Sequence, residues 1–222
     1  MTVSGTVTFS DELWDSAADV YDAVRAHPFL TGLTDGTLPH EAFGHFVTQD
    51  SHYLRGYARA LAVLAARAPT EDDTTLFAQH AAGAIAAEQE MHAELSASLR
   101  IDRSGTPGPT TLAYTSYLLA TVHGGSFAEG LGAVLPCYWI YARVGEALLA
   151  GSSPDPLYAR WIAMYGGDEF QAVVDAAVGV MDRVAADLAP VERERVLAHY
   201  RTTSRYEWMF WDAAWRLETW PV

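Results

Sequence analysis

The sequence predicts an all-α protein that forms a single helical domain over residues 1–222. Apolar residues recur at spacings of three and four along most of the chain, and no segment shows the alternation between turn signals that marks β-strands. Half of the 222 residues are hydrophobic, which is enough for one large core, and no loop is long enough to separate two cores.

Caps and turns divide the chain into successive helices. Thr70 with Asp73, and Ser126 with Glu129, have the spacing of capping boxes, and Asp168 is expected to cap a later helix. The segments TDGTLP and DRSGTPGP are predicted turns or loops. The expected helices cover about residues 13–24, 39–68, 70–99, 111–123, 126–151, a short segment from 155, then 168–188 and 190 to the tryptophan-rich end.

The charge balance excludes several classes of partner and mechanism. There are 28 acidic residues against 14 basic ones, a formal charge of −14 that repels nucleic acid and anionic membrane surfaces. Every basic residue is an arginine. The chain therefore lacks the lysine that a P-loop or a Schiff-base enzyme requires.

Targeting signals and cysteine usage favour a cytoplasmic protein. The N-terminal residues MTVSGTVTFS have no basic and apolar signal-peptide pattern, and the longest strongly apolar uncharged stretch, Gly130–Ala142, is too short to cross a bilayer. The single cysteine cannot form an internal disulfide or a multi-cysteine metal site.

That cysteine, Cys137, follows a proline inside a predicted helix. Helical geometry places it on one face with Gly130, Ala133 and Tyr141, where small neighbours leave space beside the thiol. Pro136 lacks an amide hydrogen and is expected to kink the helix there. Two interpretations remain open: an inert buried thiol, which is common, or a thiol that faces a pocket.

Two further segments set carboxylates among aromatic residues. Asp50, Tyr53 and Tyr57 share one helix face, and Glu207 shares another with Phe210 and other residues. Burial would raise the pKa of Glu207 and make it a candidate proton donor, and an unpaired buried Asp50 would be costly. The alternatives are solvent-exposed carboxylates or an ordinary i, i+4 partner for Glu207.

Several motifs, in order and spacing, resemble the thiaminase II (TenA) family of aminopyrimidine aminohydrolases. They run from His27 to Trp215 and comprise HPF with DGTLP, QDSHYL, AYTSY, FAEGLGAVLPCYWIY, WIAMYGGDEF and YEWMFW. The resemblance implies a haem-oxygenase-like helical bundle, usually a homotetramer, that uses no haem, metal or other cofactor. It implies a small-molecule pyrimidine substrate: thiamin, or its aminomethylpyrimidine breakdown product, hydrolysed to hydroxymethylpyrimidine for thiamin salvage.

Carried over position by position, the resemblance makes Cys137 the nucleophile, Glu207 the proton donor and Tyr53 the residue that sharpens the reactivity of the thiol. The remaining positions bind the substrate; Asp50, Tyr141 and Tyr165 hold the aminopyrimidine, and Tyr114 and Phe210 form aromatic walls. His52 stands where some members have a tyrosine, which leaves the substrate preference open.

Two other functions are compatible with parts of the sequence. Glu88 and His92 have the i, i+4 spacing of ligands in a di-iron helical-bundle oxidase, although the eight histidines provide no second motif of this kind. A non-catalytic pyrimidine-binding or regulatory protein is the other alternative. Binding alone would require neither Cys137 nor Glu207.

Overall fold

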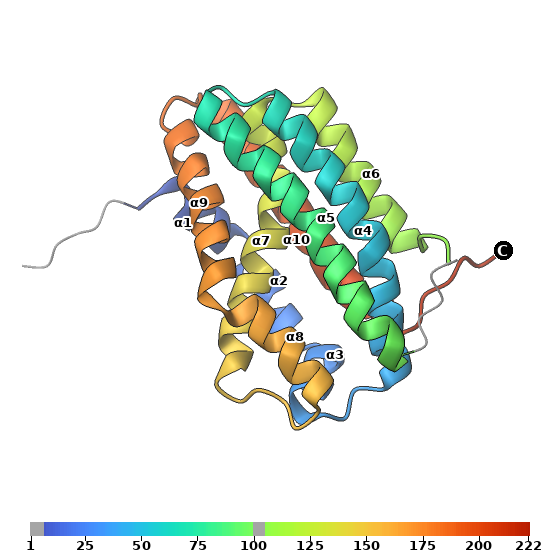
Figure 1. Cartoon of the computed structure of the whole chain (residues 1–222). Helices are drawn as coiled ribbons and strands as arrows, with labels where there is room; N and C mark the ends of the chain where they lie inside the picture. Colours follow the sequence, from blue (N-terminus) through green and yellow to red (C-terminus); the bar gives the residue numbers. More distant parts are fainter. Residues whose placement is uncertain (1–6, 100–104) are drawn as a thin grey trace, which may run out of the picture.

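The computed structural model describes residues 7–99 and 105–222, and for residues 88 and 90–99 it describes the backbone alone. Every regular element within these ranges is an α-helix, which confirms the predicted fold class (Figure 1). The helices are α1 (Phe9–Ser16), α2 (Ala18–Arg25), α3 (Pro28–Asp35), α4 (His40–Ala66), α5 (Glu71–Leu99), α6 (Pro109–Gly124), α7 (Phe127–Leu149), α8 (Pro156–Gly166), α9 (Asp168–Ala185) and α10 (Pro190–Trp215).

Helix α7 is the interior element around which the others pack. It contacts α4, α6, α8, α9 and α10, and all of its residues from Ala128 to Pro136 are buried. Figure 1 shows α4, α5 and α6 side by side, with α8 and α9 across α7 from them. A helix that is apolar on all sides is suited to this central place.

The predicted helix starts are largely confirmed, because caps are local signals. Ser126 Oγ accepts a hydrogen bond from the Glu129 amide at 3.2 Å, and Thr70 Oγ1 accepts one from the Asp73 amide at 3.1 Å. The prediction that Asp168 caps α9 is wrong: Gly167 is the N-cap and Asp168 is the first helical residue. There the Asp168 carboxylate still has a favourable position near the positive end of the helix dipole.

The N-terminal region differs from the prediction in two ways. The expected helix over residues 13–24 is broken at Ala17 (φ −122°, ψ 15°) into α1 and α2. The apolar spacing continues across the break because Leu13, Ala17 and Val24 are all buried in the same core. Helix α3 was not predicted; the His27 imidazole caps it by accepting a hydrogen bond from the Phe29 amide at 3.1 Å.

A glycine pair lets α7 and α8 approach closely. A Cβ on Gly145 would lie 2.4 Å from the backbone nitrogen of Gly166, a distance that no side chain tolerates. This contact brings Tyr165 of α8 beside Tyr141 of α7, with ring centroids 4.9 Å apart. The position of Tyr165 therefore depends on two glycines, Gly145 one turn after Tyr141 and Gly166 directly after Tyr165.

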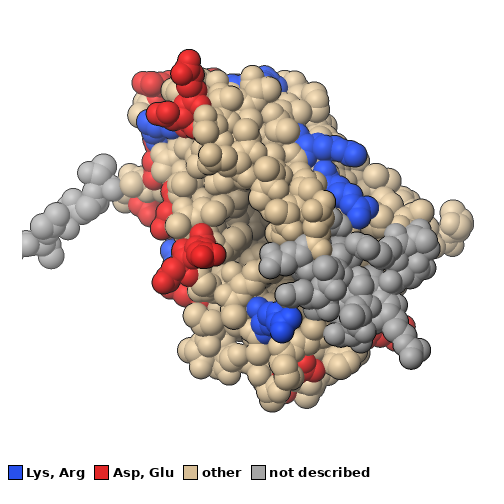
Figure 2. Space-filling model, in the orientation of Figure 1, with Lys and Arg blue, Asp and Glu red and all other residues tan. Residues whose placement is uncertain are grey.

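The surface of the described residues is strongly polar on one side. Figure 2 shows acidic side chains gathered along the side of α9, with arginines spread over other parts of this face. No helix in the described part of the chain is both long enough and apolar enough to span a bilayer. Trp211 is fully buried, whereas Trp215 and Trp220 are 39% and 48% exposed, so the tryptophan-rich end is only partly core.

Candidate active site

Helix α4 contributes a buried acid and two phenols from one face. Asp50 is 2% exposed, so the alternative of a solvent-exposed aspartate is excluded. The Tyr53 and Tyr57 rings lie parallel, with centroids 5.5 Å apart and an interplanar angle of 21°. This arrangement follows directly from the i, i+3, i+7 spacing, which stacks side chains over successive turns.

Helix α10 contributes Glu207, which is 1% exposed. Tyr114 of α6 donates a hydrogen bond from its hydroxyl to Glu207 Oε1 at 2.5 Å. Burial raises the pKa of Glu207 to about 8; the Tyr114 bond opposes this rise, and the charge of Asp50 adds to it. Because a pKa of about 8 lies above neutral pH, the carboxyl is mostly protonated at pH 7 and can donate a proton.

Cys137 lies on α7 directly after the buried Pro136, and its side chain is half-buried. Burial raises the pKa of the thiol well above its ordinary value, and the nearby charges of Glu207 and Asp50 raise it further. The hydroxyls of Tyr53 and Tyr57, as possible donors near the sulfur, act in the opposite direction. The resting state is therefore a neutral thiol beside a neutral acid.

Tyr53 is the phenol most directly associated with the thiol. Among the described residues its Oη is a buried atom without a hydrogen bond of ordinary geometry. The Tyr53 hydroxyl nevertheless lowers the pKa of Cys137, which places it near the sulfur. We interpret it as a donor poised toward the sulfur rather than one engaged elsewhere.

Aromatic rings surround these polar groups. The Tyr53 ring lies 4.8 Å from that of Tyr114 and 5.6 Å from that of Phe210. The Tyr141 ring lies 5.1 Å from that of Trp211 and 4.9 Å from that of Tyr165. The electrostatic influence of Cys137, Asp50 and Glu207 reaches both Tyr141 and Tyr165, so all eight residues singled out in the sequence converge in one region.

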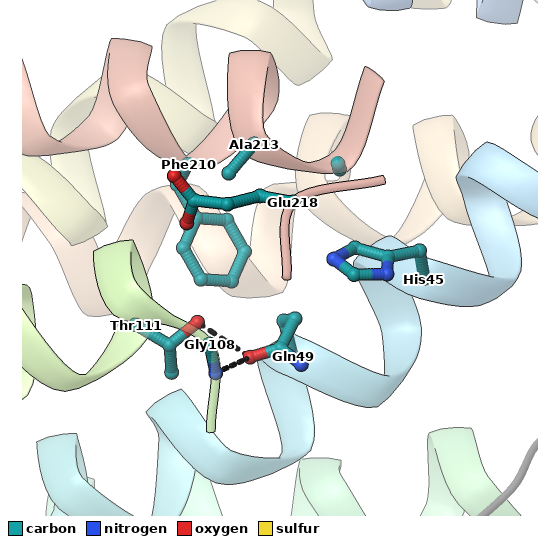
Figure 3. Close-up of a pocket in the computed structure, with 8 residues that line it drawn as sticks. His45, Gln49, Gly108, Thr111, Phe210, Ala213 and Glu218 are labelled. Carbon is teal, nitrogen blue, oxygen red and sulfur yellow. Dashed lines mark hydrogen bonds between the residues drawn. The ribbon is translucent and has the colours of Figure 1, made fainter. Parts of the chain in front are cut away.

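A pocket lined in part by Phe210 is shown in Figure 3. Gln49 Oε1 accepts hydrogen bonds from the Gly108 amide and from Thr111 Oγ1, each at 2.8 Å. Glu218 Oε2 accepts one from the Thr110 amide at 2.9 Å. These polar groups satisfy each other and fix the start of α6, the helix that carries Tyr114. The residues lining this pocket are His45, Gln49, Gly108, Thr111, Phe210, Ala213, Ala214 and Glu218.

The proposed di-iron ligands cannot be compared with the structure, because the side chains of Glu88 and His92 lie outside the described residues. Among the side chains that are described, no group of three or more His, Cys, Asp or Glu residues is arranged to hold a metal ion.

Three residues near the thiol received no role from the sequence. Helical spacing placed Tyr57 on the helix face of Asp50 and Tyr53 but gave it no role. Tyr138 follows the cysteine directly in the PCYW motif. His80 comes from α5, and its Nδ1 lies 2.9 Å from the Tyr138 hydroxyl. No local pattern signals a contact between residues 58 positions apart.

The fold and the site together define an all-helical protein with a buried thiol and a buried carboxyl in an aromatic setting. Residues 14–217 match the TENA/THI-4/PQQC family, and the chain belongs to this family. The TenA homologue protein from P. horikoshii OT3 has a similar structure, with a TM-score of 0.87 and 30% identity over 95% of this chain and 99% of that one. A Shewanella denitrificans domain with a haem oxygenase-like fold, 18% identical, has a TM-score of 0.73 over 93% of this chain and 91% of its own, so the fold class expected from the resemblance is confirmed.

Named relatives are similar over nearly the whole chain. The aminopyrimidine aminohydrolase of Bacillus subtilis (strain 168) is 38% identical over 216 residues, which is 96% of this chain and 92% of that protein. The enzyme of the same name from Halalkalibacterium halodurans is 33% identical, over 96% of this chain and 98% of its own length. The thiamine biosynthesis multifunctional protein ThiED of Corynebacterium efficiens is 37% identical over 94% of this chain, which matches 28% of that larger protein.

Proposed function

We propose that this protein hydrolyses 4-amino-5-aminomethyl-2-methylpyrimidine, thiamin, or both to 4-amino-5-hydroxymethyl-2-methylpyrimidine by covalent cysteine catalysis, in thiamin salvage. The observation that carries the proposal is the convergence of Cys137 from α7 and Glu207 from α10 within one cluster of buried tyrosines. The names of the relatives in Bacillus subtilis, Halalkalibacterium halodurans and Corynebacterium efficiens support the substrate class and the pathway.

The proposal includes a cavity between Cys137, Glu207 and the tyrosines around them. Cys137 and Tyr165 both retain accessible surface, although they lie deep enough for burial to be the largest influence on their pKa values. Accessible surface on side chains this deep supports an internal space rather than the outer surface. Flat aromatic walls suit a planar heterocycle, which gains stacking contacts as well as burial.

The reaction requires a nucleophile because the pyrimidine ring is electron-rich and ammonia is a poor leaving group from the methylene that the ring carries. The sulfur of Cys137 would form a bond to the ring carbon next to a ring nitrogen, while Glu207 transfers its proton to that nitrogen. Loss of aromaticity then allows the exocyclic amine or thiazole to leave. The amine departs as neutral ammonia from its protonated form, and the thiazole departs as the neutral base. Water adds at the methylene and releases one proton to solvent, the carbon–sulfur bond breaks as the thiolate leaves, and the ring nitrogen returns its proton to Glu207.

The other residues would orient the ring for this attack. Asp50 would accept hydrogen bonds from the exocyclic amino group, and Tyr141 and Tyr165 would hold the aminopyrimidine against it. Tyr114 and Phe210 would form aromatic walls, and Tyr53 would donate to the developing thiolate. Assembly as a cytoplasmic homotetramer belongs to the proposal as well, since it rests on the resemblance and on composition.

Product analysis tests the proposed reaction. We expect incubation with the aminomethylpyrimidine or with thiamin to yield hydroxymethylpyrimidine together with ammonia or the free thiazole, identified by mass spectrometry. Heat-inactivated protein is the control. Calorimetric binding of either compound without any turnover would instead favour the non-catalytic pyrimidine-binding alternative.

A further inference from the structure

Three polar side chains that the proposed reaction does not use lie in a row beside the thiol. They come from three helices: Tyr57 from α4, Tyr138 from α7 and His80 from α5. Both tyrosines are buried and His80 is half-buried. Ring centroids are 5.7 Å apart for Tyr57 and Tyr138, and 5.5 Å apart for Tyr138 and His80.

A hydrogen bond joins two of these groups, His80 and Tyr138, and ring packing joins the third, Tyr57, to Tyr138. His80 Nδ1 lies 2.9 Å from Tyr138 Oη. The Tyr57 and Tyr138 hydroxyls influence each other's pKa, and the Tyr57 hydroxyl lowers the pKa of the Cys137 thiol, which places it near both Tyr138 and the sulfur. In this structure the Tyr57 hydroxyl donates to the Val134 carbonyl oxygen at 3.0 Å.

The row of side chains addresses a difficulty in the proposed reaction. The Cys137 thiol must lose its proton when sulfur attacks, yet burial and the charge of Asp50 oppose ionisation. Glu207 cannot serve as the base, because the reaction needs it protonated as the acid. The imidazole of His80 can take a proton, since burial lowers its pKa and keeps it neutral at pH 7.

The side chains that contact His80 are compatible with its imidazole accepting a proton. Tyr138 faces it from α7, and Phe77 of its own helix packs edge-on with centroids 6.0 Å apart. Burial lowers the pKa of His80, and neither of these two contacts carries a charge that would hold the ring in one protonation state.

We propose that His80 is a positioning residue for the nucleophile, which accepts the thiol proton of Cys137 through the hydroxyls of Tyr57 and Tyr138. This inference rests on the proposed role of Cys137. The Tyr57 hydroxyl turns from Val134 toward Tyr138 by rotation about its C–O bond. The S–H bond then breaks as Tyr57 takes that proton, Tyr57 passes its own proton to Tyr138, and Tyr138 passes its own to Nδ1 of His80. The products are a thiolate and an imidazolium, with no change of oxidation state.

Alkylation of the thiol tests this role without any substrate. Because Cys137 is the only cysteine, uptake of iodoacetamide followed by intact-protein mass spectrometry reports on this sulfur alone. In the native protein we expect the alkylation rate to change little with pH around neutrality, because the proton moves from the thiol to the neutral His80 within the protein and none is exchanged with solvent. In His80→Asn and Tyr138→Phe we expect a rate about tenfold lower at pH 7 that rises about tenfold per pH unit.

The chain provides a matched control. His199 Nδ1 lies 2.8 Å from Tyr117 Oη, the same kind of contact in another part of the bundle. His199→Asn is expected to keep the native alkylation profile. Should His80→Asn fail to fold, Tyr138→Phe decides, because it keeps the ring and removes only the hydroxyl.

Native profiles in both His80→Asn and Tyr138→Phe would overturn the inference. The proposed function fails on a different result, namely Cys137→Ser hydrolysing the aminomethylpyrimidine as fast as the native protein. If Cys137→Ser is inactive while His80→Asn and Tyr138→Phe both keep the native alkylation profile, the proton transfer to His80 is overturned and the proposed function is not.

Discussion

Cys137→Ser is expected to lower hydrolysis of the aminomethylpyrimidine by at least about 10³-fold. A hydroxyl is a far weaker nucleophile than a thiol, and a site that already opposes ionisation of sulfur offers no base strong enough for serine. The measurement is the rate of hydroxymethylpyrimidine formation. Calorimetry on the same variant should show that substrate still binds, because the oxygen replaces sulfur without disturbing the aromatic walls.

Retained binding separates loss of chemistry from loss of the site. If the serine variant turned over at a rate within a few-fold of the native rate, Cys137 would be an inert buried thiol, the interpretation that its burial alone also allows. Circular dichroism confirms that the variant is folded before the comparison is made.

Glu207→Gln is expected to have the second large effect, a loss of about 10²- to 10³-fold in kcat. Glutamine preserves the shape and can accept the Tyr114 hydrogen bond, but it cannot give a proton to the ring nitrogen. In the native protein kcat should also fall as pH rises through about 8, since the carboxyl then loses the proton it must donate. This alkaline limb should be absent from the residual activity of the variant.

Glu194→Gln is the matched control, because Glu194 is an exposed glutamate on the same helix. It should keep both the rate and the alkaline limb. A Glu207→Gln enzyme with a native pH profile would assign the proton transfer to another group.

Local sequence signals predicted much of the fold, and helical spacing predicted which residues of the site share a helix face. Spacing alone placed Asp50, Tyr53 and Tyr57 on one face of a helix, but it left open whether Asp50 is exposed, and the structure shows that all three are buried. The rise in the pKa of Glu207 was also predicted, because burial beside aromatic rings has one electrostatic direction for a carboxyl. The break at Ala17 was not visible, since the apolar spacing runs through it.

Contacts between distant segments lay beyond the sequence. The bond from Tyr114 to Glu207 joins residues 93 positions apart, and its length and partner depend on how α6 and α10 pack. The same holds for His80 and Tyr138. Aromatic residues in these motifs are equally compatible with ordinary core packing, so the roles of individual side chains came from the family resemblance and not from periodicity.

The central claim is that the sulfur of Cys137 on α7 and the carboxyl of Glu207 on α10 act on the same heterocycle. A crystal structure of Cys137→Ser with the aminomethylpyrimidine bound tests it most directly. We predict that the ring lies between position 137 and Glu207, with a ring nitrogen about 3 Å from the carboxyl and the adjacent carbon facing the serine oxygen. A ring bound elsewhere, or one that contacts Glu207 while side chains separate it from position 137, would contradict the account.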